Sequence, residues 1–323
     1  YGQREVRAYL ASRLSGSFAA VTNVFSEAAR DSRVPTPTSV LDFGTGPGTA
    51  IWAAHARWGN SINSYTGIDI SEPMLDSAEA LLSQPAEQFI NSTHTPIPQD
   101  LETASPDWDA RPSPDKVSLL RYLTPLRDDA EPTHDLVVAA FTLSELPTPA
   151  IRADTVNQLW RRTRQTLVVI DHGSLNGSEL VRAVRSQLLE TGDAEIIGPC
   201  QHAGTCPMTG TQQACMFSQR YWISGLSRTM TGDKRDLNDQ RYSYIIIKRK
   251  NEEEGAPGQL VSTDPSKWAR VMIPPIKKTG QVLADVCTSE GTLERQLFSK
   301  RLGKEVYRAL RKTMWGDLVP YRP

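Results

Sequence analysis

Hydrophobic and polar positions along this chain predict an alternation of helices and strands. Across residues 1–33, apolar side chains recur every three or four positions, which predicts an amphipathic helical segment that Pro35 and Pro37 end. Apolar runs predict strands at 39–43, 64–70, 135–141, 166–170 and 242–248, and further spacing predicts helices over 49–58, from Ser71 and over 151–162. Uninterrupted apolar strands that alternate with helices are typical of a parallel sheet covered on both faces, so we expect an α/β fold.

The pattern changes after Lys250. Residues 251–258 form a charged linker with Gly and Pro, and β-type runs follow around 268–273, 281–287 and 292–299 before a basic helical stretch at 304–313. Residues 91–116 are rich in Pro, Thr, Ser and Asp and predict a loop. We therefore expect a helical lead-in (1–35), an α/β domain (36–250) and a small β-rich C-terminal module with a final helix (251–323).

Composition is that of a soluble globular protein, with 39% hydrophobic and 23% charged residues among 323. No apolar run approaches the roughly 20 residues that a membrane span needs, so we expect no membrane contact. The net charge is −1, but the stretch from Lys267 to Pro323 holds twelve Lys/Arg against five Asp/Glu. This local excess of positive charge predicts a basic face that binds a polyanion. The alternative is a helix face that is only solvated. Because the first residue is Tyr1, we expect the natural start and any targeting peptide to lie outside this sequence.

A glycine-rich loop follows the first predicted strand, in the sequence Asp42-Phe-Gly44-Thr-Gly46-Pro-Gly48. Glycine is needed where a turn is tight and a ligand approaches the backbone. The next strand ends at Asp69, whose carboxylate can accept ribose hydroxyls. The spacing resembles the S-adenosylmethionine site of class I methyltransferases more than a dinucleotide site. We expect these five residues to bind the cofactor, unless the loop is kept for its geometry alone.

The sequence indicates a cofactor site more clearly than it indicates residues that would catalyse a reaction. The stretch Ala140–Pro147 lacks both the Asn/Asp-Pro-Pro-aromatic motif of amino-methylating enzymes and the nucleophilic Cys of cytosine-C5 enzymes. Glu145 is the one obvious acid or base there, and a capping or packing role suits it better. We therefore assign no catalytic residue and leave open whether the chain is an enzyme.

Three of the four cysteines, Cys200, Cys206 and Cys215, lie in a turn-rich loop (199–216), and Cys287 lies far downstream. Four thiolates satisfy a four-iron cluster, and Pro207 directly after a cysteine is common in iron–sulfur loops. Zinc is the alternative, with four cysteines or with His202 in place of Cys287. Two disulfides would need an oxidising compartment, which nothing else here indicates. With Cys287 as a ligand, the metal would fasten the C-terminal module to the preceding domain.

A combination of motifs in consistent order covers most of residues 36–320. It comprises Leu-Asp-Phe-Gly-Thr-Gly-Pro-Gly-Thr, Leu-Ser-Glu-Leu-Pro, Cys-x5-Cys-Pro-x7-Cys-x-Phe-Ser-Gln-Arg, Trp268-Ala-Arg-Val, Asp285-Val-Cys-Thr and Trp315-Gly-Asp317. This closely resembles the methyltransferase-like assembly factor family of the mitochondrial small ribosomal subunit, whose bacterial relatives are often labelled rRNA methyltransferases. A departure is Gln201-His202 after the first cysteine, where Pro-His is expected.

The resemblance implies a class I methyltransferase (Rossmann-like) fold and a 4Fe-4S cluster held by Cys200, Cys206, Cys215 and Cys287. It also implies a mitochondrial matrix location, small-subunit rRNA and ribosomal proteins as partners, and a monomer within the particle. The alternative function is an active S-adenosylmethionine-dependent rRNA methyltransferase. Trp268, Trp315 and Tyr321 can stack on bases or pack the module. The basic residues expected to contact RNA phosphates are Lys277, Lys278, Lys300, Arg301, Lys304, Arg308, Arg311 and Lys312.

Overall fold

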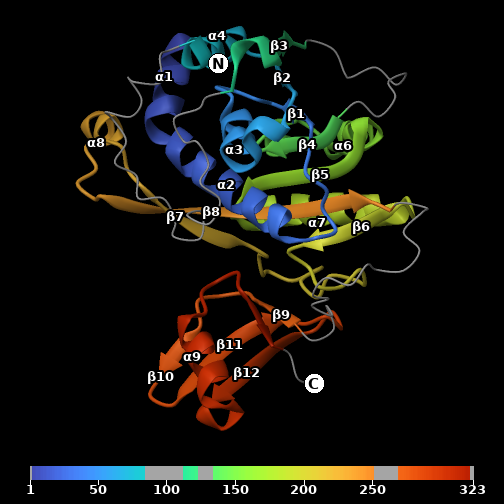
Figure 1. The fold of residues 1–323 in the computed structure, drawn as a ribbon, viewed down its shortest axis with the longest axis vertical. Coiled ribbons are helices and arrows are strands. Elements are labelled where there is room, and N and C mark those ends of the chain that lie inside the picture. Colours follow the sequence, from blue (N-terminus) through green and yellow to red (C-terminus); the bar gives the residue numbers. More distant parts are fainter. Residues whose placement is uncertain (1, 84–111, 123–133, 251–267, 321–323) are drawn as a thin grey trace. The chain divides into compact units, whose positions relative to one another are not determined.

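The computed structural model describes residues 2–83, 112–122, 134–250 and 268–320. The chain begins with two helices, α1 (Gln3–Ser12) and α2 (Leu14–Arg30), where the periodicity predicted one helical segment. Arg13 separates them, and its N–H donates to the carbonyl of Tyr9. The predicted apolar stripe is confirmed at Val6, Val21 and Phe25, which are all buried. Helix α2 packs beside α3 (Thr49–Trp58), as Figure 1 shows, and α1 packs on α4 (Glu72–Ser83).

The central sheet has the strand order β3-β2-β1-β4-β5-β8-β6, with β7 paired to β8. Strands β1 to β5 pair in parallel, whereas β6 pairs with β8 in antiparallel register. A 3-2-1-4-5 order is that of a doubly wound sheet, and β8 continues the sheet between β5 and the edge strand β6. The predicted fold is confirmed. The strands are β1 (Ser39–Phe43), β2 (Ser64–Asp69), β3 (Val117–Arg121), β4 (His134–Ala140), β5 (Thr163–His172), β6 (Ala194–Gly198), β7 (Phe217–Trp222) and β8 (Leu237–Arg249).

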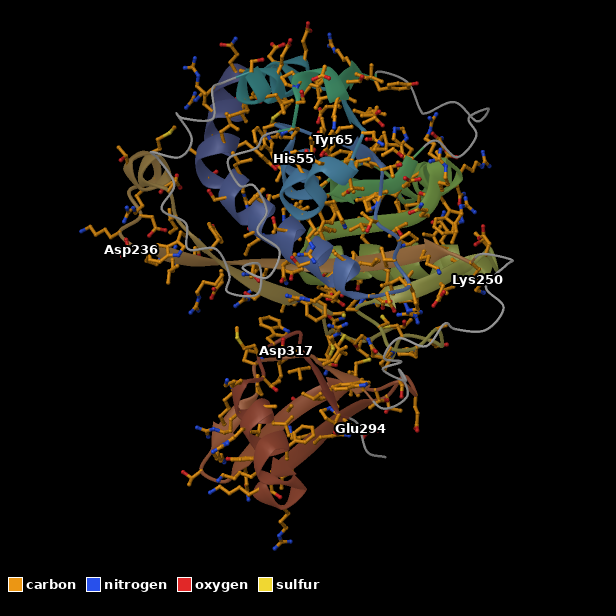
Figure 2. All side chains as sticks on the ribbon, viewed as in Figure 1. His55, Tyr65, Asp236, Lys250, Glu294 and Asp317 are labelled. Atoms are coloured by element: carbon orange, nitrogen blue, oxygen red, sulfur yellow. The ribbon has the colours of Figure 1, made fainter. Side chains whose placement is uncertain are left out.

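Side-chain caps begin three of the other helices. Thr148 accepts a hydrogen bond from the N–H of Ile151 and precedes Pro149, the first residue of α6 (Pro149–Arg162). Ser174 caps α7 (Leu175–Glu190), and Ser224 caps α8 (Gly225–Thr231). Short 3-10 turns lie at η1 (Gly59–Ser61), η3 (Pro114–Lys116) and η4 (Leu143–Glu145). Figure 2 shows His55 of α3 close to Tyr65 of β2, and the His55 Nδ1 atom lies 3.0 Å from the Tyr65 hydroxyl.

The C-terminal segment forms a second sheet, of order β10-β11-β9-β13 with β12 paired to β11. Along β11, buried Val282, Ala284 and Val286 alternate with more exposed residues, so one face of the sheet builds a small core with Leu310. The bounds are β9 (Trp268–Val271), β10 (Ile276–Lys278), β11 (Gln281–Cys287), β12 (Leu293–Ser299), η6 (Lys300–Leu302), α9 (Lys304–Lys312) and β13 (Leu318–Pro320).

The predicted strands and helices are present, with ends shifted by a few residues. The strands and α-helices without a prediction from the sequence are β3, β6, β7, β10, β13, α7 and α8. Most of the predicted loop 91–116 lies outside the described residues, but its last three positions form η3. The linker 251–258 also lies outside them. Among the helices that the structure describes, none is long and apolar enough to cross a membrane.

Contacts divide the chain into two units. The first comprises residues 1–171 with 219–240, and it contains the glycine loop. The second comprises residues 172–218 with 241–323. It contains helix α7, the cysteine loop and the whole C-terminal sheet, so the four cysteines belong to one unit.

Candidate functional site

The glycine loop between β1 and α3 takes a backbone conformation that favours glycine at three positions. Gly44, Gly46 and Gly48 have φ angles of 72°, 52° and 83°. A Cβ atom on Gly44 would lie 2.2 Å from the Thr142 hydroxyl oxygen, so Gly44 also makes room for the segment after β4. A Cβ on Gly46 would meet nothing within 4 Å, which leaves that side of the loop open. The loop therefore has one packed glycine and one that faces free space.

Asp69 lies at the carboxyl end of β2, as predicted, and joins the loop to the next helix. Its Oδ2 atom accepts a hydrogen bond of 2.8 Å from the N–H of Gly46, and its Oδ1 atom accepts one of 2.8 Å from the N–H of Ser71. Each carboxylate oxygen has a second acceptor site. Asp69 can therefore fix the loop and still accept a ligand hydroxyl.

Asp42 differs from Asp69 because its carboxyl is internal, with 1% of the residue exposed. Thr45 donates a hydrogen bond of 2.7 Å from its hydroxyl to Asp42 Oδ2. Burial raises the pKa of Asp42 to about 7, and the negative charge of Asp69 adds to this effect. Asp42 thus braces the loop from inside, on the side away from solvent.

Two residues near this loop have no signal in the sequence. Phe141, directly after β4, is a non-glycine residue with a φ of 58°, and its N–H donates to the carbonyl of Ile170. Tyr9 of α1 lies within electrostatic reach of Glu145 and Asp42, and burial raises the pKa of its phenol. Glu145 itself is exposed on η4. The tyrosine was indistinguishable from other apolar positions of an amphipathic helix.

The four predicted cysteines lie within electrostatic reach of one another. All four are free and half-buried. Burial raises the pKa of the Cys215 thiol well above its usual value, and the charges of Cys200, Cys206 and Cys287 add to this. Burial and the thiols of Cys200 and Cys206 raise the pKa of Cys287 to about 12. In the described parts of the chain, however, no group of three or more His, Cys, Asp or Glu is arranged to hold a single metal ion.

Serine side chains hold the third cysteine by its backbone. The N–H of Cys215 donates a hydrogen bond of 2.7 Å to the Ser178 hydroxyl of α7. The Ser243 hydroxyl of β8 donates one of 2.7 Å to the carbonyl of Cys215. Both serines are buried, so Cys215 is fixed between a helix and a strand of the same unit. No local pattern marks either serine, because their partner is at least 28 residues away along the chain.

Two buried arginines hold the start of the cysteine loop. Arg185 of α7 donates from Nη2 to the carbonyls of His202 and Gly204, at 2.9 and 2.7 Å. Arg270 of β9 donates from Nε to the carbonyl of Pro199, at 3.0 Å. Both arginines lower the pKa of the Cys200 and Cys287 thiols, although burial raises it more. Arg270 belongs to the Trp268-Ala-Arg-Val motif, whereas Arg185 has no motif that could have identified it.

His202 lies beside the fourth cysteine. Its Nε2 atom is 3.8 Å from the Cys287 sulfur, and its buried Nδ1 atom has no hydrogen-bond partner. Gly291, with a φ of 77°, approaches so closely that a Cβ there would lie 3.1 Å from the imidazole ring. The turn after β11 thus brings both Cys287 and a glycine against the histidine.

The predicted basic residues lie on the C-terminal sheet and its helix. All eight are exposed, and none forms an ion pair with a side chain that the structure describes. Arg311 of α9 donates a hydrogen bond of 3.2 Å to the carbonyl of Lys278, which joins the helix to β10. Trp268 and Trp315 are half-buried, and Tyr321 lies outside the described residues.

Comparison with known proteins identifies relatives along nearly the whole chain. The chain is 30% identical to the protein named ribosome assembly protein METTL17, mitochondrial, from Homo sapiens, over 97% of this chain and 62% of that protein. It is 31% identical to Rsm22-cox11 tandem protein 2, mitochondrial, from Schizosaccharomyces pombe, over 58% of this chain and 29% of that protein. The chain thus spans less than two thirds of the length of either relative. A solved SAM-dependent methyltransferase from Aquifex aeolicus matches with 18% identity and a TM-score of 0.38, over 62% of this chain and 91% of that one.

The family comparison covers more of the chain than any single motif. The family described as mitochondrial small ribosomal subunit Rsm22 matches residues 3–320, from α1 to the last described strand, β13. The resemblance expected from the motifs is confirmed. This chain belongs to the Rsm22 family.

Proposed function

We propose that this chain acts in assembly of the mitochondrial small ribosomal subunit and binds rRNA through a methyltransferase-like scaffold. The observation that carries the proposal is the family match over residues 3–320, together with the human relative named a mitochondrial ribosome assembly protein. The exposed basic residues of β10, η6 and α9 support a nucleic-acid contact, because Lys and Arg neutralise phosphates and release counterions. The matrix is the compartment that this function requires.

The four-cysteine site belongs to the same proposal. Four thiols within electrostatic reach of one another are a donor set suited to an iron–sulfur cluster, and the buried guanidiniums beside them suit the negative charge of thiolates. Cys200, Cys206, Cys215 and Cys287 would hold a 4Fe-4S cluster, with zinc as the alternative. Such a cluster would supply a metal-dependent link within the second unit, between the cysteine loop and β11.

The test combines metal analysis with binding to the small ribosomal subunit. We expect about four irons and four sulfides per anaerobically purified chain, and co-sedimentation of the loaded chain with small subunits. Cys287→Ser should lower both. Gln281→Ala, at the exposed start of the same strand, is the matched control and should lower neither. One zinc with no iron would exclude the cluster, and absence of co-sedimentation by the loaded chain would exclude the ribosomal role.

A second candidate function, rRNA methylation with S-adenosylmethionine, has one observation in its favour. The loop is open at Gly46, and Asp69 at the end of β2 keeps acceptor sites for a ribose. The test is calorimetry with S-adenosylmethionine on the metal-loaded chain. Binding that Gly46→Arg abolishes would support cofactor competence, and a nucleotide modification that disappears in the same variant would support catalysis. Absence of binding to the unaltered chain would reject both.

A further inference from the structure

Arg185 carries a buried positive charge for which the structure describes no carboxylate partner. The residue is 4% exposed. Its Nη2 group donates hydrogen bonds to the carbonyls of His202 and Gly204, but its buried Nε–H has no hydrogen-bond partner. Removing one partner of a buried ion pair is strongly destabilising, since an isolated buried charge keeps its desolvation cost. The position of Arg185 therefore calls for a negative group nearby.

The groups that face Arg185 are the thiols of the cysteine site. Its positive charge lies within electrostatic reach of Cys200, Cys287 and His202, and it favours a lower pKa of each of these groups. Arg270, 5% exposed, approaches the same two thiols from β9. Arg182 of α7 acts on Cys215, but it lies 3.9 Å from the carboxylate of Glu179. Arg185 thus differs from Arg182 in having no acidic partner among the described residues.

Neutral thiols would leave the guanidinium uncompensated, whereas metal-bound cysteines are thiolates. A cluster with four thiolates adds negative charge on reduction, and its potential depends on the charges and hydrogen bonds around it. A fixed positive charge beside it stabilises the reduced form more than the oxidised form. The same charge also favours retention of the thiolate set.

We propose that Arg185 is the fixed counter-charge of the cysteine site, and that its guanidinium raises the reduction potential of the bound cluster and favours cluster retention. This inference rests on the proposed function, because it assumes that the site holds an iron–sulfur cluster. It assigns to α7 a role in tuning the cluster besides that of supporting the loop.

The alternative is that Arg185 only clamps the loop through its two carbonyl hydrogen bonds. Substitution by Lys and by Gln separates the two roles. Arg185→Lys keeps the charge but removes the planar fork, whereas Arg185→Gln keeps a donor and removes the charge. Arg249→Gln is the matched control, because Arg249 belongs to the same unit and already pairs with Asp193.

The experiment is a redox titration of the purified, cluster-loaded full chain, followed by absorption and electron paramagnetic resonance, with iron content measured for each variant. We expect Arg185→Gln to shift the midpoint potential to lower values and to reduce iron content. Arg185→Lys should remain near the unaltered chain in potential, and Arg249→Gln should change neither quantity.

Each other outcome has a defined meaning. An unchanged potential in loaded Arg185→Gln would overturn the inference while leaving the cluster in place. If Arg185→Gln loads no iron, Arg185→Lys decides. If Arg185→Lys has an iron content and a midpoint potential near those of the unaltered chain, the result would support the role of the positive charge. If Arg185→Lys also loads no iron, the result would overturn the inference in favour of the clamp. An unaltered chain without iron would instead refute the cluster in the proposed function, and the inference with it.

Discussion

At the scale of single residues, the carboxyl groups of Asp42 and Asp69 contact the same glycine loop but differ in burial and in hydrogen bonding. Asp69 is half-buried and bonded to two backbone N–H groups. Asp42 is enclosed, and the Thr45 hydroxyl donates a hydrogen bond to it. An enclosed carboxyl such as that of Asp42 favours the neutral acid, because burial penalises the charged form. The residue type alone carries neither property.

This difference predicts a pH-dependent stability. Because the pKa of Asp42 rises from 3.8 to about 7 on folding, its contribution to stability is fully present below about pH 3.8 and is lost as the pH rises through about 7. We expect the urea midpoint of the unaltered chain, taken relative to that of Asp42→Asn, to fall as the pH rises from about 4 to about 7. Chemical unfolding at several pH values measures it. Equal slopes in the two proteins would contradict the assignment.

A second residue acts in the opposite direction. Burial, together with Arg164 and Arg162, lowers the pKa of His134 to about 4. The stability that neutral His134 contributes is present above about pH 6.5 and is lost as the pH falls through about 4. The two contributions have opposite signs and overlap between about pH 4 and 6.5, so they offset each other there, and the comparison with Asp42→Asn is what isolates the effect of Asp42.

At the scale of elements, β10 and α9 form a basic surface whose members are distant in sequence. Arg311 donates to the carbonyl of Lys278, so the helix and the strand present their charges together. The buried side of the same sheet supports them, since Val282 and Leu310 belong to one apolar core. A small packed module can thus hold an array of cations in a defined arrangement.

If this basic surface binds RNA, binding should depend on salt. Lys278→Glu combined with Arg311→Glu should weaken binding to small-subunit rRNA. The slope of log K against log salt should also decrease by about 0.7–0.9 for each phosphate that the chain no longer neutralises. Filter binding across a salt series measures both quantities. The double reversal Arg4→Glu and Arg7→Glu, on exposed positions of α1, is the matched control. Equal weakening by both pairs would show a general charge effect and remove this surface from the proposal.

At the scale of the whole molecule, the cysteine site and the glycine loop fall in different units. The second unit brings together α7, β6, the cysteine loop and the C-terminal sheet, although the sequence separates them. Metal binding contributes folding free energy, on the order of 10 kcal/mol for structural zinc. The stability of the second unit should therefore depend on metal more than that of the first.

Hydrogen exchange with and without the metal tests this dependence. On chelation under reducing conditions, we expect amide protection to fall in α7, β11 and the loop between Cys200 and Cys215. Protection of β1, β2 and β4 should remain, because these strands belong to the first unit. A uniform loss of protection across both units would contradict a local role for the metal, and an unchanged second unit would exclude a structural one.

The sequence by itself determined the elements whose signal is local. Apolar runs located β1, β2, β4, β5 and β8, and helical spacing located α3, α4 and α6, because periodicity is contained within each segment. Helix α7 also carries such a signal, in its Ser174 cap and buried Val181 and Val184, yet it was not predicted. The glycine loop and the grouping of four scarce cysteines were predicted from residue type and spacing.

Only the tertiary structure decided which distant groups surround those motifs. Ser178, Ser243 and Arg185 meet the cysteine loop from a helix and a strand, and no local pattern marks them. The raised pKa of Asp42 likewise depends on the packing around it. Burial, charge pairing and contact between segments far apart in the chain are properties of the folded state, so they cannot be located from periodicity or spacing alone.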